Sequence, residues 1–203
     1  MAGLPYKAGL IPVNKGGKGQ VQGALESFQT SVAAPAMYSG DPVAISPNGM
    51  VVLATSAGQN LLGVIEGFFW IDPTSKQPTE SRYKSASVSS ANGLYNGIRF
   101  KSGAGGPGVK VITDTEQLYA VKATTSVAIT KLGDKIAWVR TGGSTVTGQS
   151  NGAVSIATPT SVMFLRVKGV LRAQENVSGA TVDNDWGVDD TVVLVELDDA
   201  VRL

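Results

Sequence analysis

Short apolar runs separated by turn-forming residues dominate the sequence from Tyr38 onward. The runs PVAI at 42–45, MVVLAT at 50–55 and LLGVIEGFFW at 61–70 each have the length of a β-strand. Asn48-Gly49, between the first two runs, is a dipeptide typical of tight hairpin turns. This stretch therefore predicts a compact unit of three strands.

The same pattern continues to the end of the chain. Further strand-like runs lie at 87–101, 109–113, 118–140, 153–158, 161–172 and 191–199. The last run has apolar residues at both odd and even positions, which predicts a central or covered strand. We expect an all-β protein whose body, residues 37–203, is a compact β-barrel or β-sandwich of short antiparallel strands.

Residues 1–36 follow a different pattern. A short apolar run at 10–13 precedes the Gly- and Lys-rich stretch NKGGKGQ. Leu25, Phe28 and Val32 could form one face of a short helix, but Gly23 weakens it, so we predict an extended chain. The segment is expected to be an extended N-terminal arm that becomes ordered against a neighbouring subunit; a disordered tail is the alternative.

Residues 71–87 contain two prolines, several hydroxyl residues and five charged side chains, which predicts a long polar loop. Long loops often make functional contacts. We therefore predict that the arm and this loop bind a partner. The candidate interaction residues are Tyr6, Lys7, Lys15, Lys18, Lys76, Arg82 and Tyr83.

A weak internal sequence repeat, the sequence echo, indicates that the body could comprise two similar subdomains, 37–110 and 111–203. Gly40-Asp41-Pro-Val-Ala-Ile, followed by Leu62-Gly63-Val64-Ile65, is matched by Gly133-Asp134-Lys-Ile-Ala-Trp, followed by Val167-Lys168-Gly169-Val170. The alternative is that β-proteins simply reuse such turns. Gly accommodates positive φ and Asp bonds nearby amides, so both aspartates are interpreted as turn formers.

The composition excludes many kinds of chemistry. The chain has no Cys and no His, which excludes disulfides, thiolate metal sites and every catalytic triad that uses a histidine. Paired carboxylates could still act on glycosides, but Asp41, Glu66, Asp134 and Glu196 have no diagnostic spacing. We predict that the protein is not an enzyme and name no catalytic residue.

No cofactor or metal is predicted either. Gly103, Gly105 and Gly108 match G-x-G-x-x-G, but a strand-like run follows them where a dinucleotide site needs a helix. The acidic stretch 183–190 fails the EF-hand pattern, since Gly187 and Leu194 occupy positions that need ligands. We interpret it as a solvated acidic turn, with an irregular calcium loop as the alternative.

The charges argue against nucleic acid as a partner. The 17 basic residues are scattered and balanced by 16 acidic ones, so no basic stripe emerges. The first 36 residues are mildly basic and residues 183–203 are acidic, which suits head-to-tail contacts or a solvated tail. No leader sequence is recognised and no apolar run approaches the ~20 residues of a membrane span, so no membrane association is expected.

The segments SGDPVAI at 39–45 and LLGVIEG at 61–67 resemble the small capsid decoration (cement) proteins of tailed bacteriophages. In that family a Gly-Asp-x-Val strand, a short hairpin and a closing Gly-Val-x strand form a compact barrel-like unit. The resemblance implies a structural virion protein, present in many copies and without a cofactor. It would be assembled in the host cytoplasm and would bind the outer surface of the major capsid protein shell across neighbouring subunits.

Self-association is also expected, with a homotrimer ahead of a dimer. The alternative function is a tail- or fibre-associated module that binds a host glycan. In that case exposed aromatic residues such as Trp186, Tyr83 or Tyr95 would stack on sugar rings.

Overall fold

The computed structural model confirms an all-β fold. It describes residues 9–13, 24–31, 34–55, 59, 61–72, 74–86, 94–95, 98–99, 105–156, 163–171, 174–177, 180–189 and 191–198. Within this part of the chain the regular structure is β-strand, apart from one 3-10 turn, η1 (Ile129–Lys131).

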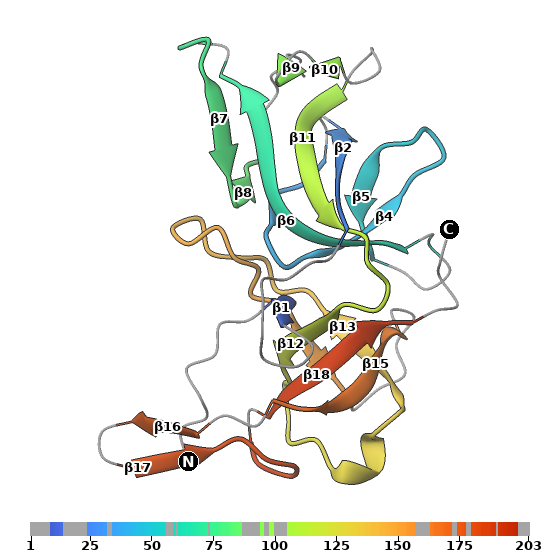
Figure 1. The fold of residues 1–203 in the computed structure, drawn as a ribbon, viewed down its shortest axis with the longest axis vertical. Coiled ribbons are helices and arrows are strands. Elements are labelled where there is room, and N and C mark those ends of the chain that lie inside the picture. The colour runs from blue at the N-terminus through green and yellow to red at the C-terminus, as the bar shows by residue number, and fades with distance from the viewer. Residues whose placement is uncertain are drawn as a thin grey trace.

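The first sheet closes into a five-stranded barrel, drawn in the upper half of Figure 1. Its strands are β2 (Leu25–Ser31), β4 (Pro42–Ile45), β5 (Val51–Leu53), β6 (Leu61–Ile71) and β11 (Gly105–Ile112). Their order is β11-β2-β5-β4-β6, and β6 pairs with β11 to close the barrel. Neighbouring strands are antiparallel except β2 and β5. The predicted three-strand unit is confirmed as β4, β5 and β6.

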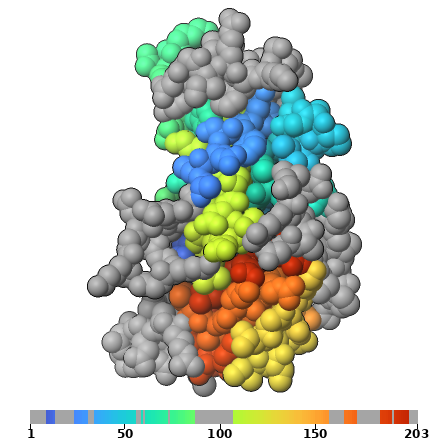
Figure 2. Space-filling view, turned by 45° about the vertical axis from the view of Figure 1, so that its right-hand side comes forward, coloured from blue at the N-terminus to red at the C-terminus, as the bar shows by residue number. Residues whose placement is uncertain are grey.

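The second sheet forms the lower half of the molecule (Figure 1). Its barrel strands are β12 (Leu118–Lys122), β13 (Lys135–Val139), β14 (Ala153–Ser155), β15 (Met163–Val170) and β18 (Val192–Leu197). They are ordered β12-β18-β15-β13-β14, and a parallel bridge between Ala123 and Val154 joins the two ends. In Figure 2 residues near 110–120 lead from one barrel to the other.

The remaining strands are short and lie outside the barrels. β1 (Ile11–Val13) pairs with β12, and β7 (Pro78–Ser81) extends the first sheet beyond β6. Three two-stranded pairs complete the fold: β3 (Met37–Tyr38) with β8 (Tyr83–Lys84), β9 (Leu94–Tyr95) with β10 (Ile98–Arg99), and β16 (Gln174–Val177) with β17 (Ala180–Asp183).

The two barrels begin their second strand with the same turn. Gly40 and Gly133 both have positive φ, 88° and 87°, a conformation that favours glycine. The N–H of Gly40 donates to Ile65 O at 2.8 Å, and the N–H of Ile65 donates to Asp41 O at 3.0 Å. The second barrel repeats this pair of bonds: the N–H of Gly133 donates to Val167 O, and that of Val167 to Asp134 O.

The barrels also share a β-bulge at the same place. Between β6 and β11, Ile65 lies opposite Val111 and Gly67 opposite Lys110, so Glu66 is the extra residue. Between β15 and β18, Val167 lies opposite Val195 and Gly169 opposite Leu194, so Lys168 is the extra residue. Strand order, strand direction and register therefore agree in the two barrels.

This correspondence corrects part of the sequence echo. The Gly40-Asp41 and Gly133-Asp134 segments are equivalent, as predicted. The second half of the echo was aligned wrongly, because Ile65, and not Leu62, is the structural equivalent of Val167. The prediction paired the correct strands, β6 and β15, but offset their residues by three positions.

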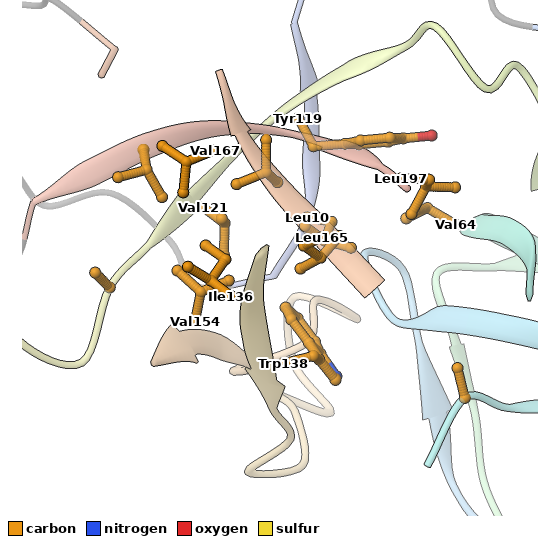
Figure 3. Packing of buried hydrophobic residues seen from close by; sticks show 14 of the residues in the cluster. Leu10, Val64, Tyr119, Val121, Ile136, Trp138, Val154, Leu165, Val167 and Leu197 are labelled. Carbon is orange, nitrogen blue, oxygen red and sulfur yellow. The ribbon is translucent and has the colours of Figure 1, made fainter. Parts of the chain in front are cut away.

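The core is nearly continuous between the barrels. One cluster fills the first barrel and includes Val43, Ile65 and Phe68. A larger cluster fills the second barrel and also takes in Val64 from β6, which lies beside Leu197 in Figure 3. β18 lies between β12 and β15, and its residues are buried or partly buried, which confirms the prediction of a central or covered strand.

The described parts of residues 1–36 belong to the two sheets. β2 is a strand of the first barrel, and β1 extends the second sheet. The N–H of Gly9 donates to Gly152 O at 2.7 Å and that of Leu10 to Gly40 O at 3.0 Å. Leu10 is only 1% exposed. Residues 9–13 thus tie the two barrels of one chain together, where we had expected an arm that becomes ordered against a neighbouring subunit.

The prediction of a polar loop at 71–87 was wrong in part, because Ile71, residues 78–81 and residues 83–84 lie in β6, β7 and β8. β6 continues to Ile71 and turns back into β7, forming one long hairpin. The Asp72 carboxylate accepts the N–H groups of Thr74 at 2.8 Å and Ser75 at 2.7 Å, which shapes the turn. The polar residues face solvent on a paired strand, so polarity alone did not identify a loop.

Candidate interaction surface

The long connection between β13 and β14, residues 140–152, packs against the β3–β8 pair and the residues that follow β3. The N–H of Ser39 donates to Gly148 O at 3.0 Å, and that of Ser150 donates to Ser39 O at 2.9 Å. The Tyr38 ring lies directly over Gly143, where an added Cβ would come within 2.3 Å of it. These contacts make the junction between the barrels close and specific.

A buried ion pair crosses this junction. Asp41 is fully buried, and its Oδ2 lies 3.4 Å from Arg140 Nε and from Nη2. Arg140 Nη2 also donates to Ala36 O at 2.6 Å. Burial raises the pKa of Asp41, and the Arg140 guanidinium reduces this rise without cancelling it. The pair links the turn before β4 to the end of β13.

A second buried charge lies beneath the base of the β6–β7 hairpin. Lys84 of β8 is fully buried, and its Nζ donates to Ala34 O at 3.0 Å and Ser85 O at 3.3 Å. Burial lowers the pKa of this amine. Its two carbonyl acceptors show a structural role, since they hold residues 34–36 against β8.

The outer face of the first barrel has an open cleft of about 300 Å³ across β7, β6 and β11. Four charged residues surround it, Glu66, Glu80, Arg82 and Lys110, together with Gly67, Phe68 and Ser81. Lys110 Nζ lies 3.1 Å from Glu80 Oε1. The missing side chain at Gly67 keeps the space between these groups open.

The chemistry of this cleft suits contact with another protein surface. Sites for small molecules are mostly apolar and bury the ligand, whereas this cleft is open and has charges of both signs at its rim. Opposite charges at a rim favour one partner and one orientation more than they add affinity. The cleft can therefore recognise a polar protein surface of complementary charge.

The structure places three of the predicted interaction residues on one hairpin and its base. Lys76 is exposed in the turn, with a positive φ of 59°. Arg82 lies at the other end and lines the cleft. Tyr83 stacks on Tyr38, with ring centroids 4.9 Å apart, and so supports the junction. The predicted Tyr6, Lys7, Lys15 and Lys18 lie outside the described residues.

The sequence analysis did not identify the other charged residues that line the cleft with Arg82. Glu80 and Lys110 are far apart in sequence and meet because β7 and β11 both flank β6. Glu66 was considered only as one of four carboxylates. The available signal was Glu66-Gly67 in a long apolar strand, a pattern typical of a bulge.

The other carboxylates considered for chemistry have structural partners. Asp134 pairs with Lys131 at 3.2 Å, and Glu196 pairs with Lys168. In the acidic stretch, the Asn184 side chain makes two hydrogen bonds with the backbone of Val192. Its Nδ2 donates to Val192 O, and its Oδ1 accepts the Val192 N–H. Among the described residues no group of three or more acidic side chains is arranged to hold a metal ion.

The aromatic residues considered for glycan stacking are not gathered into one surface. Trp186 is half-buried and packs against the core of the second barrel, and Tyr83 stacks on Tyr38. The side chain of Tyr95 lies outside the described residues. In the part of the chain that the structure describes, no helix has the length and apolar character to cross a membrane.

Comparison with known proteins gives no relative from which a role could be transferred: neither the protein-family models nor the curated proteins include a match to this chain.

Proposed function

We propose that this protein is a structural component of a tailed-phage particle, which decorates and stabilises the capsid by binding the outer surface of the major capsid protein shell. The observation that supports this proposal best is the arrangement of the residues that carry the family resemblance. SGDPVAI and LLGVIEG form β4 and β6, which lie side by side in the first barrel with β5 on the other side of β4.

The surface features are consistent with a function based on contact. The β6–β7 hairpin extends from the first barrel (Figure 1), and the charged cleft lies along its base. Buried ion pairing and backbone hydrogen bonds join the barrels, so the chain can act as one body that positions this surface. The mechanism is burial of interface area between the protein and neighbouring capsid subunits, repeated over the shell.

The test is the copy number of the chain in purified particles, measured by quantitative mass spectrometry against the major capsid protein. Hundreds of copies per particle are expected for a shell component. A dozen or fewer copies would assign the chain to the tail or portal, and complete absence would refute a virion role.

The contact surface can be tested separately with Glu66→Arg, which reverses one charge at the rim of the cleft. We expect weaker binding to shells that lack the chain, with an unchanged melting temperature because Glu66 is exposed. Asp134→Arg is the matched control, since it reverses an exposed carboxylate on the other barrel. Equal binding by both variants and the unchanged chain would exclude the cleft from the interface.

A further inference from the structure

The two barrels are enlarged at the same connection. In the first, the chain between its fourth and fifth strands, β6 and β11, holds β7, β8, β9 and β10. In the second, the chain between β15 and β18 holds β16 and β17. Because the barrels agree in strand order and register, these two insertions are equivalent in position.

Each insertion contributes to a hairpin that projects from its barrel: β7 pairs with the end of the barrel strand β6, and β16 pairs with β17. The β6–β7 hairpin lies at the upper left of Figure 1 and the β16–β17 hairpin at the lower left, so they mark opposite ends of the molecule on one side. Within the described residues, β7 pairs only with β6, and β16 and β17 pair only with each other. β16 and β17 form a separate two-stranded sheet, and such a hairpin is marginally stable alone in water and gains stability when a second surface covers it. β7 is the edge strand of the first sheet, and a sheet edge can pair with another chain.

We propose that the two barrels are two copies of one attachment module, and that each module uses its hairpin to bind one partner subunit. One chain would then bridge two equivalent subunits of a protein lattice. This inference rests on the proposed function, in which the lattice is the capsid shell.

The duplication itself identifies the kind of partner. The two modules share register throughout the barrel, including the bulges at Glu66 and Lys168. Two copies of one module fit a surface that presents two copies of one site, as a shell of identical subunits does. Once one hairpin is bound, binding of the second becomes intramolecular, which strengthens attachment without a new kind of contact.

The first test is stoichiometry. Shells purified from a phage that lacks the gene are titrated with the labelled full-length chain, and bound chain is counted against the major capsid protein. We expect saturation at one chain for every two capsid subunits. Saturation at one chain per subunit would overturn the bridging inference while leaving decoration intact. Absence of binding would instead refute the proposed function, and the inference with it.

The second test disrupts each hairpin separately. A flexible Gly/Ser segment is inserted between Ser75 and Lys76, or between Ser178 and Gly179, in the full-length chain. Each of these two Gly/Ser variants should bind shells roughly 10²–10⁴-fold more weakly than the unchanged chain, the loss expected when a bivalent contact becomes monovalent. The same segment inserted between Asn48 and Gly49, in the turn between β4 and β5, is the control and should not change binding.

The melting temperatures of the three variants show whether the barrels remain folded. A folded variant with an insertion in either hairpin that binds as tightly as the control would overturn the inference, because that hairpin would then not contribute to binding.

Discussion

Asp41 of the first barrel and Arg140 of the second form an ion pair at 3.4 Å that is buried between the barrels. The structurally equivalent carboxylate in the second barrel, Asp134, is half exposed and pairs with Lys131 in its own turn. The equivalent Gly-Asp turns of the two barrels therefore have different roles. In the first barrel the turn joins the halves of the molecule, and in the second it faces solvent.

The exchange of Arg140 for Met should be strongly destabilising. It leaves the Asp41 carboxylate buried without its cation and removes the donor to Ala36 O. We expect the free energy of unfolding to fall by about 2–4 kcal/mol at neutral pH, somewhat below the cost for a fully buried pair, because Arg140 is partly exposed. Urea denaturation measures this loss.

Lys131→Met is the matched control, because it removes the cation from the exposed equivalent pair. Its cost should be below about 1 kcal/mol, as for surface ion pairs in general. Similar losses in both variants would contradict the role assigned to the junction.

Asp198 should make stability depend on acid pH. This carboxylate is 5% exposed; burial alone would raise its pKa, but hydrogen bonds and charge from Lys135 and Arg166 outweigh that effect and lower it. The folded state therefore binds a proton less readily than the unfolded state. The stabilisation is present above the unfolded pKa, near 3.9, and is lost as the pH falls through the lowered folded pKa. Asp198→Asn should be destabilised at pH 7, by less as the pH approaches 3.

Asp41 should make the stability of the fold depend on pH in the opposite direction. Its pKa is raised in the folded state, so its contribution to stability is present at low pH and is lost as the pH rises through that raised value. The stability of the unchanged chain relative to Asp41→Asn should therefore decrease from pH 3 to pH 7. Urea denaturation at several pH values tests both signs, and parallel slopes for the two variants would be inconsistent with the environments described above.

Gly143→Ala should loosen the junction between the barrels. The new methyl group would come within 2.3 Å of the Tyr38 ring, so either the ring or the 140–152 connection must shift. We expect a loss of about 1–3 kcal/mol, typical of overpacking, seen as a lower melting temperature. Gly169→Ala is the control, since its methyl group would meet only Leu194 Cδ1, at 3.9 Å. A larger loss of stability for Gly169→Ala than for Gly143→Ala would contradict the close contact between Gly143 and the Tyr38 ring.

Lys84→Met should change how stability depends on alkaline pH. Burial lowers the pKa of Lys84 in the folded state, so between that value and the unfolded pKa near 10.4 the unfolded chain binds the additional proton. The unchanged chain should gain stability relative to Lys84→Met as the pH rises from 7 to 10. Denaturant unfolding over this range measures the difference. A relative loss would show that the amine is better stabilised as a cation than its surroundings indicate.

The sequence by itself determined the local features of this protein. Alternating apolar runs and Gly-Asp or Asn-Gly turns predict strands and turns because they depend on side-chain period and on the freedom of glycine at positive φ. The strands β4, β5, β6 and β18 and the two Gly-Asp turns were therefore found before the fold was known. Lys76, Arg82 and Tyr83 were found only as members of a polar segment.

Tertiary structure decided the rest. The same Gly-Asp dipeptide is buried at Asp41 and exposed at Asp134 because only the first turn is covered by the connection from the other barrel. Pairing of β6 with β11 closes a barrel and brings Lys110 beside Glu80, and pairing of β1 with β12 fixes residues 9–13 between the barrels. These outcomes depend on contacts between residues far apart in the chain. Local propensity carries no information about which strand will become a neighbour or which face will be covered.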